Sequence, residues 1–204
     1  GQRVRKVTER QAPLGQTPTR MKERIYLGGV EIYREYDGNG ANVTQERETL
    51  HIMDDKQRIA LVETKTLDIT SPLTTHPSLI RYQLGNHLGS ASLEVDDDAQ
   101  LISYEEYHPY GTTSYRAMSS AIDVSTKQYR YTGKEKDEET GLYYHGARYY
   151  APWLGRWTAC DPLHALTPAR STYLPFANNP VIFVDLDGKQ PQDAFVDNFF
   201  DAMH

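Results

Sequence analysis

Two aspartate-containing sequences near the end of this chain are the places where acid–base chemistry is conceivable. Asp161 stands before a proline, and Asp185 begins the sequence Asp-Leu-Asp-Gly. Both sequences are common in turns, because aspartate accepts main-chain hydrogen bonds and glycine adopts positive φ. Two carboxyl groups in close contact can do more, because one keeps a proton and polarises a carbonyl while the other activates water. On the residues alone, both interpretations stay open.

The other reactive side chains predict no metal and no cofactor. The single cysteine, Cys160, excludes a disulfide framework and a cysteine-based zinc site, and we expect it to be a buried structural residue. Gly38-Asn39-Gly40 is followed by no helix signature, which argues against a dinucleotide loop. The histidines show neither i,i+4 nor HExxH spacing; they are His51, His76, His87, His108, His145, His164 and His204.

The elements that position these residues are predicted to be short antiparallel strands. Strand-like runs alternate with Gly, Asp and Asn turns, and helical periodicity is nearly absent before residue 190. Hairpins are expected over residues 23–36, 49–64 and 79–107. A fourth hairpin pairs residues 129–132 with 141–150 around a charged, solvated tip at 134–139. Residues 67–77 and 112–127 are expected to form irregular loops.

The C-terminal tail differs in kind from the rest of the chain. Phe195, Phe199 and Ala202 recur on one helical face, and Asp193 is placed to cap the helix. We therefore expect a short helix over residues 193–203. It is either the start of a further region, a plug held in a shell, or a helix packed on the sheet.

Composition excludes several classes of function. A net charge of −6 argues against general nucleic-acid binding, which needs a dense basic surface. No apolar run approaches the length of a membrane helix, so we expect no membrane insertion by this segment. The hydrophobic fraction of 38% is low, and 15 tyrosines partly compensate for it. Such a composition suits a sheet with water on one face.

The motifs of residues 86–162 resemble those of RHS-repeat (YD-repeat) proteins. NHLGS at 86–90 and Y-x-PYG at 107–111 are similar to a recurring unit of that family. The closing segment of the family is similar to YTGKE at 131–135, TGLYY at 140–144, ARYY at 147–150, GRW at 155–157 and DP at 161–162. The resemblance covers residues 20–188 and extends to the toxin-complex C component and to SpvB-like polymorphic toxins.

This resemblance implies an all-β fold, an antiparallel hairpin strip of a hollow RHS/YD-repeat cage. It implies three kinds of partner: the remaining shell segments in the same or a separate chain, an encapsulated C-terminal toxin, and delivery machinery. Such proteins are made in the bacterial cytoplasm and are then secreted or delivered as toxins. A complete cage needs a longer chain, so residues 1–189 are expected to be its closing core segment. Residues 190–204 would then begin the variable region or form a helical tail.

The resemblance also implies an aspartyl autoprotease that acts once and in cis. Asp161 and Asp185 match its two aspartates, and the cut falls between Lys189 and Gln190. The sequence departs from the family pattern at Cys160, in Leu186 and Lys189 of the terminal motif, and in the glycine-free stretch 163–174. These departures leave open a non-cleaving scaffold with an inactive dyad, or a register in which Asp187 replaces Asp185. A carbohydrate- or receptor-binding module is a third alternative, since tyrosine-rich faces can stack on sugars.

Overall fold

The computed structural model describes residues 2–55, 57–70, 78–119, 125–163, 165 and 171–194. The chain divides into two compact units. The N-terminal unit comprises Arg3–Tyr82 and Asp96–Asp98, and the C-terminal unit comprises Gln83–Val95 and Ala99–His204 together with Gly1–Gln2. Within the described residues the fold is all-β and antiparallel, with no helix of seven or more residues, which confirms the predicted fold class. None of these residues forms a helix able to cross a membrane.

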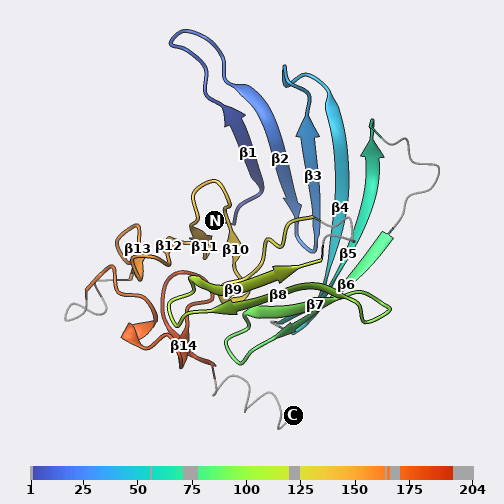
Figure 1. Ribbon diagram of the computed structural model, residues 1–204. Coiled ribbons are helices and arrows are strands. Elements are labelled where there is room, and N and C mark those ends of the chain that lie inside the picture. Colours follow the sequence, from blue (N-terminus) through green and yellow to red (C-terminus); the bar gives the residue numbers. More distant parts are fainter. Residues whose placement is uncertain are drawn as a thin grey trace. The chain divides into compact units, whose positions relative to one another are not determined.

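The N-terminal unit is a meander in which each strand pairs antiparallel with the next (Figure 1). Asp37–Gly40 is one of the Gly, Asp and Asn turns of this unit: the Asp37 carboxylate accepts the Ala41 amide, and Gly40 has φ +74°. Its strands are β1 (Arg5–Arg10), β2 (Thr19–Leu27), β3 (Val30–Tyr36), β4 (Val43–Asp54), β5 (Gln57–Asp68) and β6 (Ser78–Gly85), of which β6 belongs to this unit up to Tyr82.

The two faces of this meander carry different kinds of side chain. One face buries charge: Glu31 and Glu63 are 3% and 4% exposed and pair with Arg24 at 2.7 Å and with Arg81 at 3.2 Å. The other face carries an apolar stripe of direct cross-strand neighbours, which share a face. Its members are Leu27, Val30, Leu50, Val62 and Ile80, of which Leu27 and Leu50 are exposed.

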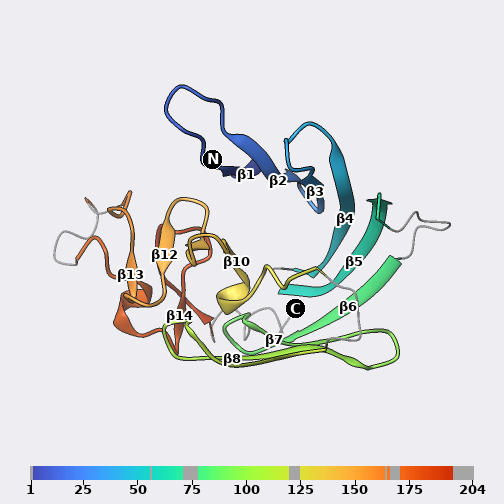
Figure 2. The ribbon, with the colours of Figure 1, turned by 45° about the horizontal axis from the view of Figure 1, so that its top comes forward.

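The C-terminal unit contains three short antiparallel arrays (Figure 2). The first is formed by β7 (Ala91–Val95), β8 (Leu101–Tyr107) and β9 (Thr113–Met118). The second is formed by β10 (Glu135–Lys136), β11 (Tyr143–Tyr144), β12 (Tyr149–Ala151) and β13 (Arg156–Trp157). The third pairs β14 (Phe183–Val184) with β15 (Gln192–Asp193).

Three expectations from the sequence are wrong here. Residues 113–118 were expected to be an irregular loop, but they form β9, whose ladder with β8 supplies the order that its own polar pattern does not predict. The partner of β11 is β10 rather than residues 129–132, since Tyr131–Gly133 forms a 3₁₀ turn. The tip at 134–139 is not fully solvated, because pairing beside β11 buries Glu135 and Asp137 to 5% and 7% exposure. The expected helix over residues 193–203 lies outside the described part from residue 195 onward, and Asp193, its expected cap, lies in β15.

An aromatic cluster forms the core of the C-terminal unit. Its rings are inclined or stacked at centroid separations of 5.2 to 6.5 Å, a range favourable for aromatic pairs. The buried members come from the motif-rich segment and from the 3₁₀ turn Phe176–Asn178: Tyr131, Tyr143, Tyr150, Trp157 and Phe176.

Three of these tyrosines clamp the turn that follows β8. Burial raises the pKa of each phenol, so each stays a neutral hydrogen-bond donor. Their hydroxyl groups donate to three consecutive carbonyl oxygens, Tyr131 to Pro109 at 2.7 Å, Tyr150 to Tyr110 at 2.8 Å and Tyr143 to Gly111 at 3.3 Å. The Y-x-PYG motif and the tyrosine motifs are thus two halves of one contact.

Candidate functional site

Two turns of the C-terminal unit approach each other and build the site. One joins β11 to β12, and the other follows β14 at residues 185–189. Gly188 has φ +76°, and a Cβ there would lie 2.9 Å from the Arg148 amide nitrogen, so glycine is required for this approach. The Ala147 amide crosses the gap and donates to the Asp187 carbonyl at 2.9 Å.

Arg148 is the centre of the site, and its side chain is 2% exposed. One terminal nitrogen, Nη1, lies 3.2 Å from Oδ2 of Asp161, and the other, Nη2, lies 3.3 Å from Oδ2 of Asp185. The guanidinium plane also stacks on Trp157, with Cζ 4.2 Å from the ring centroid. The two aspartates predicted as a dyad therefore meet at one planar cation, an arrangement that the fork geometry of arginine permits.

Asp185 is the deeply buried member of the pair, with 1% of the residue exposed. Its Oδ1 accepts the amide of Gly188 at 2.7 Å and the amide of Lys189 at 3.0 Å. Burial raises the pKa of this carboxyl to about 6, against the lowering influence of Arg148 and of the two amides. Asp185 therefore takes up a proton at mildly acidic pH.

Asp161 has a more open position, with its side chain 19% exposed. Its amide donates to the Thr172 carbonyl at 3.0 Å, and its Oδ1 accepts the Leu163 amide at 2.8 Å. The Thr172 carbonyl also accepts Arg148 Nη1 at 3.3 Å, so the segments around residues 161 and 172 are held by the same guanidinium. Solvent access and local hydrogen bonds thus distinguish Asp161 from Asp185.

The main chain between Asp185 and Gly188 is held by hydrogen bonds at every carbonyl. His145 Nδ1 contacts the Asp185 oxygen at 2.6 Å, and Lys134 Nζ donates to that of Leu186 at 2.6 Å. The Asp187 oxygen accepts the Ala147 amide, and Arg148 Nε donates to the Gly188 oxygen at 2.6 Å. The chain leading to the predicted cleavage bond is thereby fixed residue by residue.

Beyond this held segment, Lys189 and Gln190 are exposed. Lys189 Nζ pairs with Oδ2 of Asp187 at 3.1 Å, and the two side chains are 49% and 52% exposed. Asp187 therefore points to solvent, whereas Asp185 points to Arg148. The geometry favours Asp185 over Asp187 as the partner of Asp161.

His145 is buried beside the site and stays neutral. Its ring meets the Trp157 ring edge-on, with centroids 4.9 Å apart. Burial, followed by the charge of Lys134, lowers the pKa of His145 to about 3. A neutral imidazole next to a carbonyl oxygen carries its proton on the contacting nitrogen, so Nδ1 is the donor to Asp185.

Comparison with known proteins agrees with the motifs. No family model matches the chain. It is 36% identical over 190 residues to toxin subunit YenC1 of Yersinia entomophaga, covering 93% of this chain and 19% of the relative. It is 46% identical over 114 residues to YenC2 of the same organism, covering 56% of this chain and 12% of the relative.

Structural comparison extends this match to a solved complex. In the crystal structure of TcdB2-TccC3, a chain superimposes with a TM-score of 0.77 at 34% identity, over 92% of this chain and 9% of that one. The chain is a relative of the RHS-type C components of toxin complexes. It spans less than a fifth of the length of these relatives.

In this relative of the toxin-complex C components, the sequence pointed to the two aspartates but not to the groups that hold them. Arg148 and Lys134 stand inside the motifs ARYY and YTGKE, which drew attention as family signatures rather than as site residues. His145 lies between two such motifs. No local pattern identifies these three residues, because their partners are far away in the chain and only the fold brings them together.

The remaining reactive side chains of this RHS segment lie elsewhere or differ from expectation. Cys160 is exposed rather than buried, because it lies beyond the end of β13 and outside any strand, and its Sγ lies 3.1 Å from the Tyr173 hydroxyl. His87 and His108 are in turns, as predicted. No cluster of three potential metal ligands occurs among the described residues. His76, His164 and His204 lie outside them.

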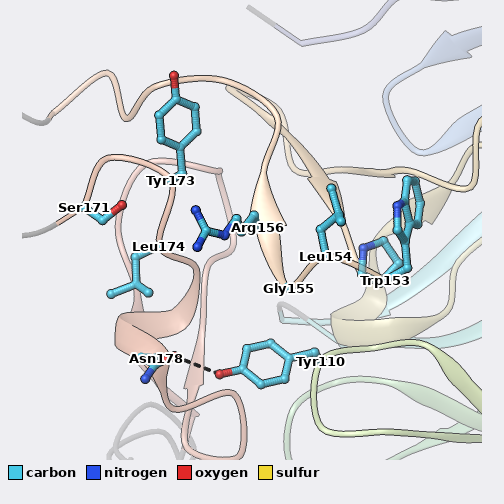
Figure 3. Close-up of a pocket in the computed structure, with 10 residues that line it drawn as sticks. Tyr110, Trp153, Leu154, Gly155, Arg156, Ser171, Tyr173, Leu174 and Asn178 are labelled. Carbon is cyan, nitrogen blue, oxygen red and sulfur yellow. Dashed lines mark hydrogen bonds between the residues drawn. The ribbon is translucent and has the colours of Figure 1, made fainter.

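A separate pocket of about 450 Å³ opens beside the β12–β13 hairpin (Figure 3). Tyr110 borders it and donates a hydrogen bond to Asn178 at 2.9 Å. Trp153 and Leu154 at the hairpin tip are 56% and 64% exposed. Aromatic, aliphatic and polar groups share the lining, which also includes Pro152, Gly155, Arg156, Ser171, Tyr173 and Leu174. This composition suits an amphipathic ligand.

Proposed function

We propose that this chain is the C-terminal part of an RHS-repeat shell that encapsulates a toxin and releases it by one autoproteolytic cut between Lys189 and Gln190. The observation that carries the proposal is the single Arg148 guanidinium bound to both Asp161 and Asp185. Residues 1–189 would then be the core segment, and residues 190–204 would begin the released region.

The different environments of the two aspartates assign their roles. Asp185 has its pKa raised to about 6 by burial, so it is the group able to hold a proton and act as the acid. Asp161 has the more open position, with its side chain 19% exposed and therefore within reach of a water molecule, so we assign it the role of the base. Pairs of titratable groups whose environments differ in this way are typical of acid–base catalysis.

The reaction follows from these roles. Asp161 takes a proton from a water molecule, whose oxygen attacks the carbonyl carbon of Lys189. Asp185 gives its proton to the reacting peptide group, the C–N bond breaks, and Gln190 leaves with a free amino group. The Lys189 amide donates to Asp185 Oδ1, so the acid is attached to the residue that carries the attacked carbonyl. Presentation within one chain supplies the effective concentration that a single turnover needs.

The test is the intact mass of the freshly expressed full-length protein beside Asp161→Asn and Asp185→Asn. We expect the wild type to break after Lys189 and both variants to stay whole. Asp187→Asn and Cys160→Ser are matched controls that should cleave normally, because Asp187 and Cys160 are exposed. Three full-length masses would instead establish a non-cleaving scaffold with an inactive dyad, joined covalently to its tail.

Encapsulation is supported by the apolar stripe of the N-terminal unit. Exposed Leu27 and Leu50 lie in a row of apolar cross-strand neighbours, and such rows are usually covered by other polypeptide. We infer that the remaining shell segments or the enclosed toxin cover it, and that the assembly is made in the bacterial cytoplasm and delivered by partner machinery. Substituting Leu27 and Leu50 by Thr should increase protease sensitivity of the enclosed toxin in the full-length protein.

A second candidate function rests on the pocket at the β12–β13 hairpin. Exposed Trp153 and Tyr173, together with Arg156, resemble the stacking and hydrogen-bonding groups that hold sugars, which supports the carbohydrate-binding alternative. Glycan-array binding by the full-length protein, lost in Trp153→Ala and kept in Leu154→Ala, would support it. Equal binding by wild type and Trp153→Ala would exclude this pocket as the site.

A further inference from the structure

We infer that His145 and Lys134 are positioning residues of the cleavage reaction, acting as a carbonyl clamp on the chain that carries the acid and leads to the cut. This inference rests on the proposed autoproteolysis and deepens it. Each of the two residues holds a main-chain oxygen of the Asp185–Gly188 segment.

The clamp consists of four donors on four consecutive carbonyls. His145 holds residue 185, Lys134 holds residue 186, the Ala147 amide holds residue 187, and Arg148 holds residue 188. In an extended strand, successive carbonyl groups point to opposite sides. The four carbonyl groups of this segment are therefore held by donors from two segments, namely Lys134 before β10 and the turn after β11. The segment is therefore bound as a fixed turn and not as an edge strand.

This geometry fixes the acid and the scissile bond together. His145 contacts the main-chain carbonyl of Asp185. The side-chain Oδ1 of Asp185 accepts hydrogen bonds from the amides of Gly188 and Lys189. Loss of the His145 donor frees the main chain from which the Asp185 carboxyl projects. Displacement of a reacting group by about 1 Å is sufficient to slow catalysis.

The clamp also explains why a single cut is final. All four held carbonyls lie on the acyl side of the bond between Lys189 and Gln190, and the hydrogen bonds to them do not depend on residue 190 or beyond. After cleavage the segment 185–189 stays in the site and occupies it. A second peptide is thereby excluded, and the released chain leaves alone.

His145 can play this role because it is a neutral donor. The titratable and charged groups around it and around Asp185 are Lys134, Arg148, Asp161, Asp187 and Lys189. His145 Nε2 has no hydrogen-bond partner within the described part of the chain and faces the aromatic cluster. The ring is thus oriented by packing and by its contact with the Asp185 carbonyl.

The experiment compares donor-keeping and donor-lacking variants in the full-length protein. His145→Asn places an amide nitrogen at the Nδ1 position, whereas His145→Leu keeps the bulk and removes the donor. Lys134→Arg and Lys134→Met form the matching pair at a half-buried position, where a folding failure is not expected. Cleavage is followed by intact mass. Exchange of the Gly188 and Lys189 amides is followed by mass spectrometry in an Asp161→Asn background.

We expect the Leu and Met variants to cleave about tenfold more slowly and to exchange both amides about tenfold faster, with near-normal behaviour of the Asn and Arg variants. Equal impairment of His145→Asn and His145→Leu would overturn the donor role in favour of ring packing. Unchanged exchange in both donor-lacking variants would overturn the clamp. If the wild type is not cleaved, the proposed function fails while the exchange experiment still decides the clamp.

Discussion

The cleavage rate should depend on pH through the buried Asp185. Burial raises the pKa of this carboxyl to about 6, and the proposed mechanism needs its protonated form. About a tenth of the molecules carry that proton at pH 7 and about nine-tenths at pH 5. The rate should therefore rise about tenfold between pH 7 and pH 5, and fall about tenfold for each further pH unit above 7.

The assay is a pulse of labelled cell-free synthesis, followed by transfer of the full-length product into buffers from pH 5 to pH 8. The fraction cleaved is read on a gel over time. His145 has its pKa lowered to about 3 and does not titrate in this range, so His145→Asn should keep the same inflection. A rate that is flat, or that rises with pH, would refute Asp185 as the acid.

A second variant tests the cause of the inflection. Arg148 lowers the pKa of Asp185, in opposition to burial. Arg148→Met removes that charge, so any residual cleavage should have its inflection moved to higher pH. An inflection that stays at the wild-type value would show that another group titrates.

Three further predictions concern stability. Gly111 has φ +87°, and a Cβ there would lie 2.4 Å from Cδ1 of Tyr131, so Gly111→Ala should lower the free energy of unfolding by about 3 kcal/mol or more in thermal or chemical denaturation. Tyr131→Phe and Tyr150→Phe each remove one donor from the clamped turn and should cost about 1 kcal/mol each, with Tyr131→Leu far worse. The pKa of Asp185 is raised from 3.8 to about 6, so its stabilising contribution is complete below pH 3.8 and is lost as pH rises through 6. In uncleaved Asp161→Asn protein this loss should reach about 3 kcal/mol and should vanish when Asp185→Asn is added.

The sequence predicted what local signals determine. Turns such as Asp37–Gly40 carry their own chemistry, and the hairpin over β4 and β5 follows from alternation and a turn. It did not predict β9, because the pattern of TSYRAM has no apolar face and the strand depends on its ladder with β8. Strands of this kind are determined by their neighbours.

The site illustrates the same limit at the level of side chains. Asp161 and Asp185 were found through motifs, whereas the role of Arg148 depends on contacts with residues 13 and 37 positions away. Glu135 and Asp137 looked like solvated charges and are buried beside β11. Burial and long-range pairing of charged groups follow from packing, which no window of sequence contains.

The departures from the family motif do not by themselves argue for an inactive site. Lys189 directs its ammonium group to Asp187, and half of its side chain is exposed. Leu186 contributes a main-chain oxygen to the clamp, and that oxygen does not depend on the side chain at this position. Cys160 is exposed, and its Sγ contacts the Tyr173 hydroxyl at 3.1 Å. The partners of Lys189 and Cys160 thus lie outside the Asp161–Arg148–Asp185 contact, and the groups of the proposed mechanism stay in place.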